Sequence, residues 1–308
     1  MKTKIPDELK ADLPQSTFGK ILAATPVVMA VVATLLAGLA TREMTIAQYT
    51  RSLAAQQQSK AGDQWNFFQA KKLRSQLQRN TVEIIGATGQ LGSLDTGAVA
   101  KLDVSFSEAG FKQSLDAVQS EHLPTPAPLK VDDNIQAAMT AFVNQVPEEE
   151  FTAAVIKVDE KALEATLRAA IDRTHAFDTA IKPLSTAVDK VEAALIKGGN
   201  GMTQVAPPLQ RDFTATRLRF AAARYDAEAR LNQTVATIYE LQVKKSNLSA
   251  ERHHKRSQQF FFGMLSAQAA VIIATFAMAA RKRNLLWSIA AAAGITAVAF
   301  ASYIYFFS

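Results

Sequence analysis

Residues 209–280 read LQRDFTATRLRFAAARYDAEARLNQTVATIYELQVKKSNLSAERHHKRSQQFFFGMLSAQAAVIIATFAMAA, and this stretch decides the fold of the chain. Its first part mixes polar and apolar residues, its last part is continuously apolar, and Gly263 is the only helix breaker in it. As one helix it would be about 105 Å long. A helix of that length needs a partner helix. The candidate is a similar stretch near the N-terminus, where an apolar run precedes a polar segment that ends near Ile85.

Three apolar runs are each long enough to cross a hydrocarbon core of about 30 Å. They occupy residues 21–40, 260–280 and 285–307, and none contains Asp, Glu, Lys, Arg or His. The first run is too long for a cleaved signal peptide and lacks a small-residue cleavage pattern, so we expect it to remain as a signal anchor. The sequence therefore predicts an all-α membrane protein with three transmembrane helices, a long antiparallel helical stalk continuous with the spans, and a small helical head domain.

The expected domain order follows from these runs. It comprises an N-terminal tail (1–20), a first transmembrane helix (21–40), a stalk helix (41–85), a helical head insertion (86–206), a second stalk helix (207–259), a second transmembrane helix (260–280), a basic turn (281–284) and a third transmembrane helix (285–307).

Local signals divide the head insertion. Ser105 and Glu108 have the spacing of a capping box that starts a helix, and the proline-rich HLPTPAPL that follows predicts an extended linker. A helix is expected from about 132 to 145. Pro147 and the three glutamates after it predict the start of another helix that continues past Ala180. We expect these helices to form a small bundle at the tip of the stalk.

The two stalk helices carry apolar residues that suggest how they pack. In the first, the large apolar residues approximate one face, namely Leu53, Trp65, Phe68, Leu73 and Leu77. The second has an apolar face that one antiparallel partner would leave uncovered, formed by Leu231, Val235, Ile238 and Tyr239. Additional helices would have to cover this face, so the pattern predicts a homo-oligomer.

Composition limits the possible partners and chemistry. The net charge is +6, with 34 basic and 28 acidic residues, and the two signs nearly balance between the first two spans. This pattern does not indicate a nucleic-acid partner and fits solvated helix faces with basic residues beside the membrane. The absence of cysteine excludes disulfide and thiolate chemistry.

The charge distribution also predicts an orientation. The basic turn Arg281–Arg283 and the lysine-bearing N-terminal tail should lie in the cytoplasm by the positive-inside rule. Three spans then place residues 41–259 and the C-terminus on the other side. In a bacterium with two membranes, this is a multi-pass protein of the inner membrane whose stalk and head are periplasmic.

The sequence has no recognisable catalytic, cofactor-binding or metal-binding motif, so we predict no residue with these roles and no cofactor. The glycine spacing of GATGQLG lacks the end of a phosphate-binding P-loop, which favours a flexible turn. His253 and His254 are adjacent and diverge by about 100° on a helix, whereas metal pairs stand three or four residues apart. The chain is therefore not expected to be an enzyme.

Two sets of residues are instead candidates for contacts. Interface candidates combine aromatic or amide character with a position on a stalk or span, and they are Trp65, Phe67, Phe68, Gln69 and Gln268. Candidates for contact with lipid headgroups are basic residues beside the spans, and they are Arg252, Lys255, Arg256, Arg281, Lys282 and Arg283.

Two stretches together resemble a bacterial membrane protein family of unknown function, the domain-of-unknown-function 4337 family. The first is AGDQWNFFQAKKLR at 61–74, within about 41–85, and the second is the terminal hairpin at about 255–308 with its basic turn, Trp287 and Gly294. The resemblance implies the same order of span, DQW-type helix and hairpin. The large centre, 86–206, departs from the family pattern. No activity is established for the family, so the resemblance bears on architecture only.

Two classes of function remain open from the sequence. The first is a structural or scaffold membrane protein that forms a homo-oligomer through its spans and stalk helices. The second is a helical sensory or ligand-binding module, and an accessory subunit of a larger membrane complex is a further possibility. Membrane lipid is an expected partner in each case.

Overall fold

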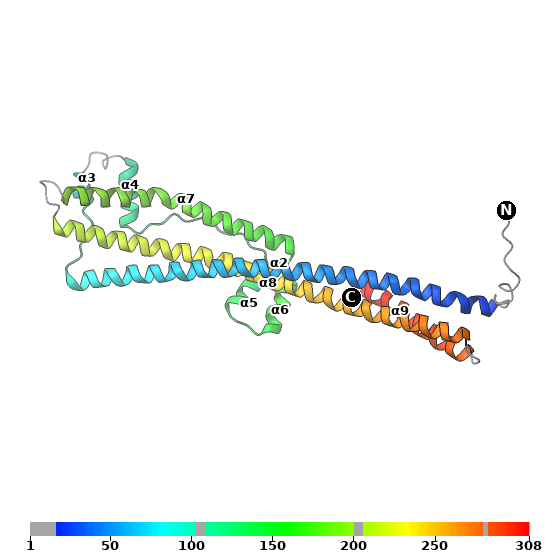
Figure 1. Cartoon of the computed structure of the whole chain (residues 1–308). Helices are drawn as coiled ribbons and strands as arrows, with labels where there is room; N and C mark the ends of the chain where they lie inside the picture. The colour runs from blue at the N-terminus through cyan, green and yellow to red at the C-terminus, as the bar shows by residue number, and fades with distance from the viewer. Residues whose placement is uncertain (1–16, 103–108, 200–205, 280–282, 308) are drawn as a thin grey trace, which may run out of the picture. The chain divides into compact units, whose positions relative to one another are not determined.

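The computed structural model describes residues 17–102, 109–199, 206–279 and 283–307, and most of them lie in α-helices (Figure 1). No β-strand occurs in these four ranges. The helices are α2 (Thr17–Thr88), α3 (Thr96–Ala100), α4 (Ala109–Gln119), α5 (Asp133–Val143), α6 (Glu148–Ile156), α7 (Glu160–Gly199), α8 (Pro207–Ala279) and α9 (Arg283–Phe307). The prediction of an all-helical chain is confirmed for the residues described.

Three of these helices, α2, α8 and α9, contain a segment that is long and apolar enough to cross a membrane. In α2 and α8 this segment runs into a polar segment without a break in the helix. The chain divides into two compact units. The membrane unit comprises Met1–Leu53 and Ser246–Ser308, and the central unit comprises Ala54–Lys245.

The apolar helices of the membrane unit bury mainly small residues and expose most of their large ones. Its core consists of Ala33, Leu36, Ala40, Phe260, Ala267 and Ala297. The large exposed side chains include Val28, Val31, Leu35, Phe262, Ile272, Phe276, Ile295 and Val298. Helices in lipid gain little from burying large apolar side chains against one another, and small residues let their backbones approach closely. This distribution is the one expected for segments surrounded by hydrocarbon.

A close approach of this kind joins α9 to α2. A Cβ atom at Gly294 would lie 2.5 Å from the Sδ atom of Met29, so only glycine fits there without a shift of the methionine. On the same pair of helices, Trp287 Nε1 donates a hydrogen bond to Thr25 Oγ1 at 3.2 Å.

In both units α2 packs on α8 through small residues spaced by seven positions, or by fourteen where Phe68 and Val243 interrupt the series, which we call the small-residue seam. Its α2 members are Ala33, Ala40, Ala47, Ala54, Ala61 and Ser75, and its α8 members are Ala215, Ala222, Ala229, Ala236, Ala250 and Ser257, all buried. The Ser257 hydroxyl donates to the Ala40 carbonyl at 2.8 Å, so side chain and backbone touch across the seam. Counted in opposite directions from that contact within the membrane unit, Ala47 falls opposite Ala250. A period of seven is the spacing that keeps one face of a helix against a partner.

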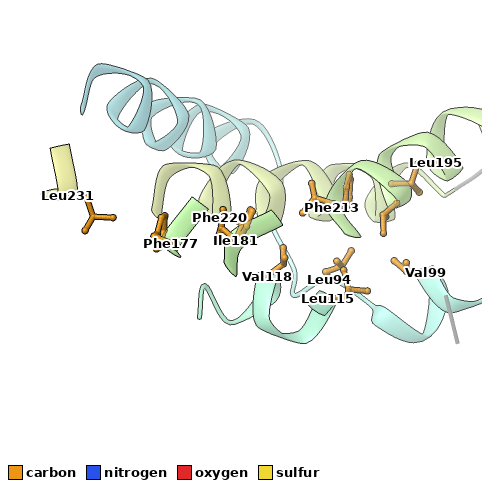
Figure 2. Close-up of a cluster of buried hydrophobic side chains, with 12 residues drawn as sticks. Leu94, Val99, Leu115, Val118, Phe177, Ile181, Leu195, Phe213, Phe220 and Leu231 are labelled. Atoms are coloured by element: carbon orange, nitrogen blue, oxygen red, sulfur yellow. The ribbon is translucent and has the colours of Figure 1, made fainter. Parts of the chain in front are cut away.

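The core of the central unit lies where α3, α4, α7 and α8 meet (Figure 2). Phe177 and Ile181 of α7, Phe213 and Phe220 of α8, and Leu115 and Val118 of α4 contribute side chains to it. Beside this core, α7 and α8 run next to each other (Figure 1) and are joined by the ion pair of Arg217 with Glu192 at 2.5 Å.

Some helix boundaries were predicted from the sequence and others were not. Pro207 starts α8 and α7 ends at Gly199, both as expected, and residues 122–132 lie outside helices as the prolines indicated. The helix predicted to begin near Ser105 starts, as far as it is described, at Ala109, and its capping box lies outside the described residues. The short α3 was not expected. Its N-cap is Asp95, whose side chain accepts from the Ala98 amide at 2.9 Å.

The prediction of one helix from Pro147 past Ala180 is wrong. The chain forms α6 up to Ile156 and then a new helix, α7, from Glu160. Asp159 accounts for the break, because its carboxylate accepts a hydrogen bond from the Ala162 amide at 2.8 Å and caps the new helix. Pro183 lies inside α7, which continues through it to Gly199.

Two packing predictions for the long helices are also wrong. Leu73 and Leu77 do not share the buried face of Ala61 and Phe68 but are exposed, because the small residues determine which face of α2 meets α8. Conversely, the apolar face at Leu231, Val235 and Ile238 needs no second copy of the chain, since these residues are buried within the chain itself.

Enlarging one member of the seam should destabilise the central unit. Ala54 is buried and its neighbour Ala55 is exposed on the same turn of α2. Ala54→Leu forces extra volume between close backbones and should lower the free energy of unfolding by about 1–3 kcal/mol. Ala55→Leu should change it by less than about 0.5 kcal/mol. Thermal unfolding followed by circular dichroism in detergent measures both variants. Equal melting temperatures for the two would show that the seam is not close-packed.

Candidate functional site

The DQW segment of α2 forms an aromatic cluster with α5 and α6 in the central unit. The Trp65 indole donates from Nε1 to Glu240 Oε1 of α8 at 3.2 Å. Its ring meets Phe68 edge-on at 5.6 Å and lies 6.4 Å from Phe142 of α5, which lies 5.9 Å from Phe151 of α6. Trp65 therefore contacts two other helices, with a hydrogen bond to α8 at its polar end and the Phe142 ring of α5 at its apolar end, and Phe142 extends the cluster to α6.

Two lysines of α8 hold the other side of α6. Lys244 forms an ion pair with Glu148 in the first turn of α6, and its Nζ lies 6.0 Å from the centre of the Phe151 ring. Lys245 Nζ donates to the carbonyls of Ile156 at 3.1 Å and Val158 at 2.7 Å. Carbonyls at a helix C-terminus lack partners in the helix, and a cation there satisfies them. The α5–α6 pair is thus fastened to both long helices.

The other aromatic and amide candidates of this segment face outward. Phe67 is 54% exposed and Gln69 is also exposed, although Trp65 and Phe68 beside them turn inward. The structure therefore divides the interface candidates into an internal pair and an external pair. The internal pair joins α2 to α5 through Trp65, and the external pair is exposed in the part of the chain that is described.

Further along α2, its basic residues turn toward acids of α8. Lys71 pairs with Glu228, and Lys72 and Arg79 bind the Asp226 carboxylate at 3.0 and 2.5 Å. Burial alone would raise the pKa of the Asp226 carboxyl, but hydrogen bonds and positive charge from Lys72 and Arg79 outweigh it and hold this pKa below its ordinary value of 3.8. The ionised carboxylate therefore stabilises the fold near neutral pH, and that contribution is lost as the pH falls through the lowered pKa.

Tyr225 lies beside this charge cluster and contacts cations from both helices. Lys71 Nζ is 5.2 Å, Arg74 Cζ 5.9 Å and Arg224 Cζ 4.9 Å from the centre of its ring. Such contacts between cations and an aromatic face add to the ion pairs that join α2 and α8.

In the membrane unit, polar contacts join α2 and α8 next to the apolar segments. His253 Nδ1 lies 2.6 Å from Glu43 Oε2, and His254 contacts Gln258 on its own helix at 3.1 Å. The two histidines thus have different partners. In the part of the chain that is described, no group of three or more His, Asp or Glu residues could hold a metal ion.

The proposed headgroup residues lie partly within the described chain. Arg252 and Lys255 are exposed, with Lys255 paired to Glu251 at 2.8 Å, and Arg256 is partly buried. Arg281 and Lys282 lie outside the described residues, and Arg283 is the first residue of α9.

Gln268 lies on the apolar segment of α8 and is exposed. It borders a groove of about 490 Å³ whose other lining residues are Ala30, Ala33, Thr34, Ala37, Val271 and Ile272. Among the described residues, no hydrogen-bond partner of its amide is found. The amide therefore faces outward from an apolar helix beside a row of small residues of α2.

A second groove, of about 440 Å³, lies between α4 and α7 in the central unit. Its polar lining consists of Ser114, Thr179, Thr186, Lys182 and Lys190. Among the described residues none that lines this groove carries a carboxylate or an imidazole, and those present offer hydrogen bonds and positive charge.

Sequence reasoning missed the residues that connect these elements. Phe142, Phe151, Lys244 and Lys245 were not singled out, because their contacts depend on the fold of a segment far from α2 in the sequence. The small-residue seam was also missed, although alanine at 33, 40, 47, 54 and 61 is visible as a repeat of seven in the sequence.

Comparison with known families agrees with the N-terminal part of the resemblance. The model of the domain of unknown function DUF4337 matches residues 18–102. The match covers α2, including the DQW segment, and reaches α3, which confirms the resemblance for this region. The terminal hairpin lies outside the matched residues, and its similarity to the family stays a prediction. No curated protein and no solved structure matches the chain.

Replacing Trp65 should release α5 and α6 while leaving the core near α7 intact. In Trp65→Ala, amides of residues 133–156 should exchange with solvent about 10–100 times faster, because the ring that connects these helices to α2 is lost. Trp65→Phe keeps an apolar ring and should give a smaller effect. Hydrogen exchange measured by mass spectrometry on the full chain in detergent reports both regions.

Phe67→Ala is the matched control, since Phe67 is an exposed aromatic residue of the same segment. It should leave exchange in residues 133–156 unchanged. An equal effect of the two alanine variants would contradict the assignment of Trp65 as the anchor.

Proposed function

We propose that this protein is a structural, non-catalytic membrane protein that forms a homo-oligomer through its transmembrane segments and stalk helices. In this proposal α2 and α8 are an antiparallel coiled-coil stalk rooted in the bacterial inner membrane, and residues 86–206 supply the helical head. The basic turn at 281–283 and the N-terminal tail lie in the cytoplasm, and the stalk and head lie in the periplasm, in agreement with the positive-inside rule.

The observation that carries the proposal is the outward-facing amide of Gln268 beside a groove of small residues. Hydrocarbon cannot hydrogen-bond an amide, so a polar side chain at this depth favours contact with protein over contact with lipid. The small, accessible residues Ala30 and Ala37 would let another helix come close enough to reach it. A second copy of the chain supplies such a helix with the same amide, which both donates and accepts hydrogen bonds.

The described contacts support a structural role rather than a catalytic one. Each polar cluster joins two helices of the chain: Lys72 and Arg79 with Asp226, Lys244 with Glu148, and His253 with Glu43. Their geometry positions helices, and the groove between α4 and α7 offers only binding groups. A ligand-binding head would use that groove, but the open amide in the span favours self-association as the main role.

The test measures self-association of the full chain in lipid vesicles. Copies labelled with donor or acceptor dyes on the N-terminal tail are reconstituted together, and energy transfer is followed as lipid dilutes them. Gln268→Leu removes the amide at similar volume and should weaken association by about 3–10-fold, the effect of one interhelical hydrogen bond of roughly 0.6–1.4 kcal/mol.

Thr275→Val is the control, because Thr275 is another exposed polar residue of the same segment whose hydroxyl already donates to the Val271 carbonyl at 2.8 Å. It should associate as the unchanged chain does. A chain that stays monomeric at every dilution would overturn the function. Equal weakening by both variants would show that Gln268 is not the contact.

A further inference from the structure

The outer face of α2 in the central unit carries a regular apolar stripe, which we call the outer stripe. Its members are Asn66, Ala70, Leu73, Leu77, Asn80 and Ile84, separated alternately by four and three residues. All six are exposed, and Leu73, Leu77 and Ile84 are 59%, 56% and 64% exposed. Spacings of four and three place the six side chains along one line on the helix, as in the seam of a coiled coil.

The outer stripe is distinct from the face that packs on α8. Ala61 and Ser75, the buried residues of this segment, point to the opposite side of the helix. The chain's own helices therefore leave the stripe uncovered in the part of the structure that is described. Three exposed large aliphatic residues in one line, on a segment outside the apolar spans, are unusual for a solvated helix face.

The charges of this segment are arranged to keep the outer stripe neutral. Lys71, Lys72 and Arg79 are engaged by Glu228 and Asp226 of α8. Between Asn66 and Ile84 the stripe has no ionisable side chain. A partner that covers the outer stripe therefore buries no charge of this chain. A charged partner surface would find no opposite charge there, whereas an equally neutral apolar surface is complementary to it.

We propose that the outer stripe pairs with the outer stripe of a second copy to form a parallel, in-register two-helix seam. The inference rests on the proposed function, because copies rooted in one membrane with one orientation present their α2 helices in the same direction. In that register Leu73, Leu77 and Ile84 each meet their own counterpart.

The polar members of the stripe favour the same register. Asn80 meets Asn80 of the second copy, and two amides can hydrogen-bond each other across the seam. An amide in an apolar seam favours the register in which it meets another amide. At the flanks, Arg74 of one copy faces Gln69 of the other, and Glu83 faces Thr88, so no like charges oppose each other.

The size of the stripe explains why membrane anchoring is part of the inference. A seam of fewer than three heptads buries less surface than a stable soluble dimer needs, which is about 1,200 Å² or more. Two copies already held together by their spans meet at a high effective concentration, and a short seam then suffices. We therefore expect the stripe to order the stalks within an oligomer rather than to create the oligomer.

The absence of cysteine in the chain allows a direct test. Single variants Leu77→Cys and Asn80→Cys place a thiol on the stripe, and Glu83→Cys places one on an exposed position about a quarter turn away. Disulfide formation requires Cβ atoms about 3.5–4.5 Å apart, so mild oxidation in native membranes should cross-link the first two variants at least about tenfold faster than the third. Non-reducing gels with mass spectrometry of the product identify the partner.

The outcomes test the seam and the proposed function separately. Rapid cross-linking of two copies at 77 and 80 but not at 83 supports the seam. Cross-linking to a different protein, or equal rates at all three positions, overturns it. If energy transfer in vesicles still shows association while 77 and 80 stay uncross-linked, the seam falls and the proposed function stands. If energy transfer is absent as well, both fall.

A second pair of variants distinguishes loss of the seam from an effect on folding. Leu77→Glu in the Asn80→Cys background opposes like charges in the seam and should slow cross-linking at least about tenfold. Gln76→Glu, on the neighbouring exposed position, should not. Unchanged helix content and melting temperature of both variants confirm that the fold is intact, and equal cross-linking rates for the two would overturn the seam.

Discussion

The structure depends on one kind of contact, the close packing of α2 on α8 through the small-residue seam. Alanines such as Ala61 and Ala236 are fully buried, and at Ala40 the contact is tight enough for the Ser257 hydroxyl to reach a backbone carbonyl. Small side chains contribute little burial energy each, but they allow dispersion contacts between backbones along the seam in both units. Close packing of small residues does not depend on whether lipid or water surrounds the helices, so the same kind of contact can join α2 and α8 in both units.

This seam determines where the large side chains must go. In the membrane unit they face outward, where hydrocarbon would surround them. In the central unit α3, α4 and α7 cover apolar residues of α8 such as Phe220 and Leu231, and ion pairs such as Asp226 with Arg79 join α2 to α8. Large apolar side chains stay exposed on α2, among them Leu73, Leu77 and Ile84, and the proposed self-association uses this surface.

The sequence alone predicted the features that local signals determine. Apolar runs without charge defined the three spans, and Pro147 with the glutamates after it marked a helix start. It failed where burial depends on tertiary contact. Leu73 and Leu77 looked like core residues by size, yet size is the wrong criterion for a seam built from alanine. Among the site candidates, the aromatic character of Trp65 indicated packing, but its partners Phe142 and Phe151 follow from the path of a distant segment. The break between α6 and α7 was missed because a single helix cap, Asp159, interrupts a sequence whose pattern is otherwise continuously helical.

The ion pairs and aromatic contacts join helices of the chain, and two exposed features, the Gln268 amide and the neutral apolar stripe on α2, are the basis of the proposed self-association. The most direct test is the intact mass of the complex extracted from its native membrane in mild detergent, with every component identified. A whole-number multiple of the 33.4 kDa chain, with at least two copies and no other protein, is the predicted result. A single copy, or a fixed proportion of foreign subunits, would contradict a self-associating scaffold.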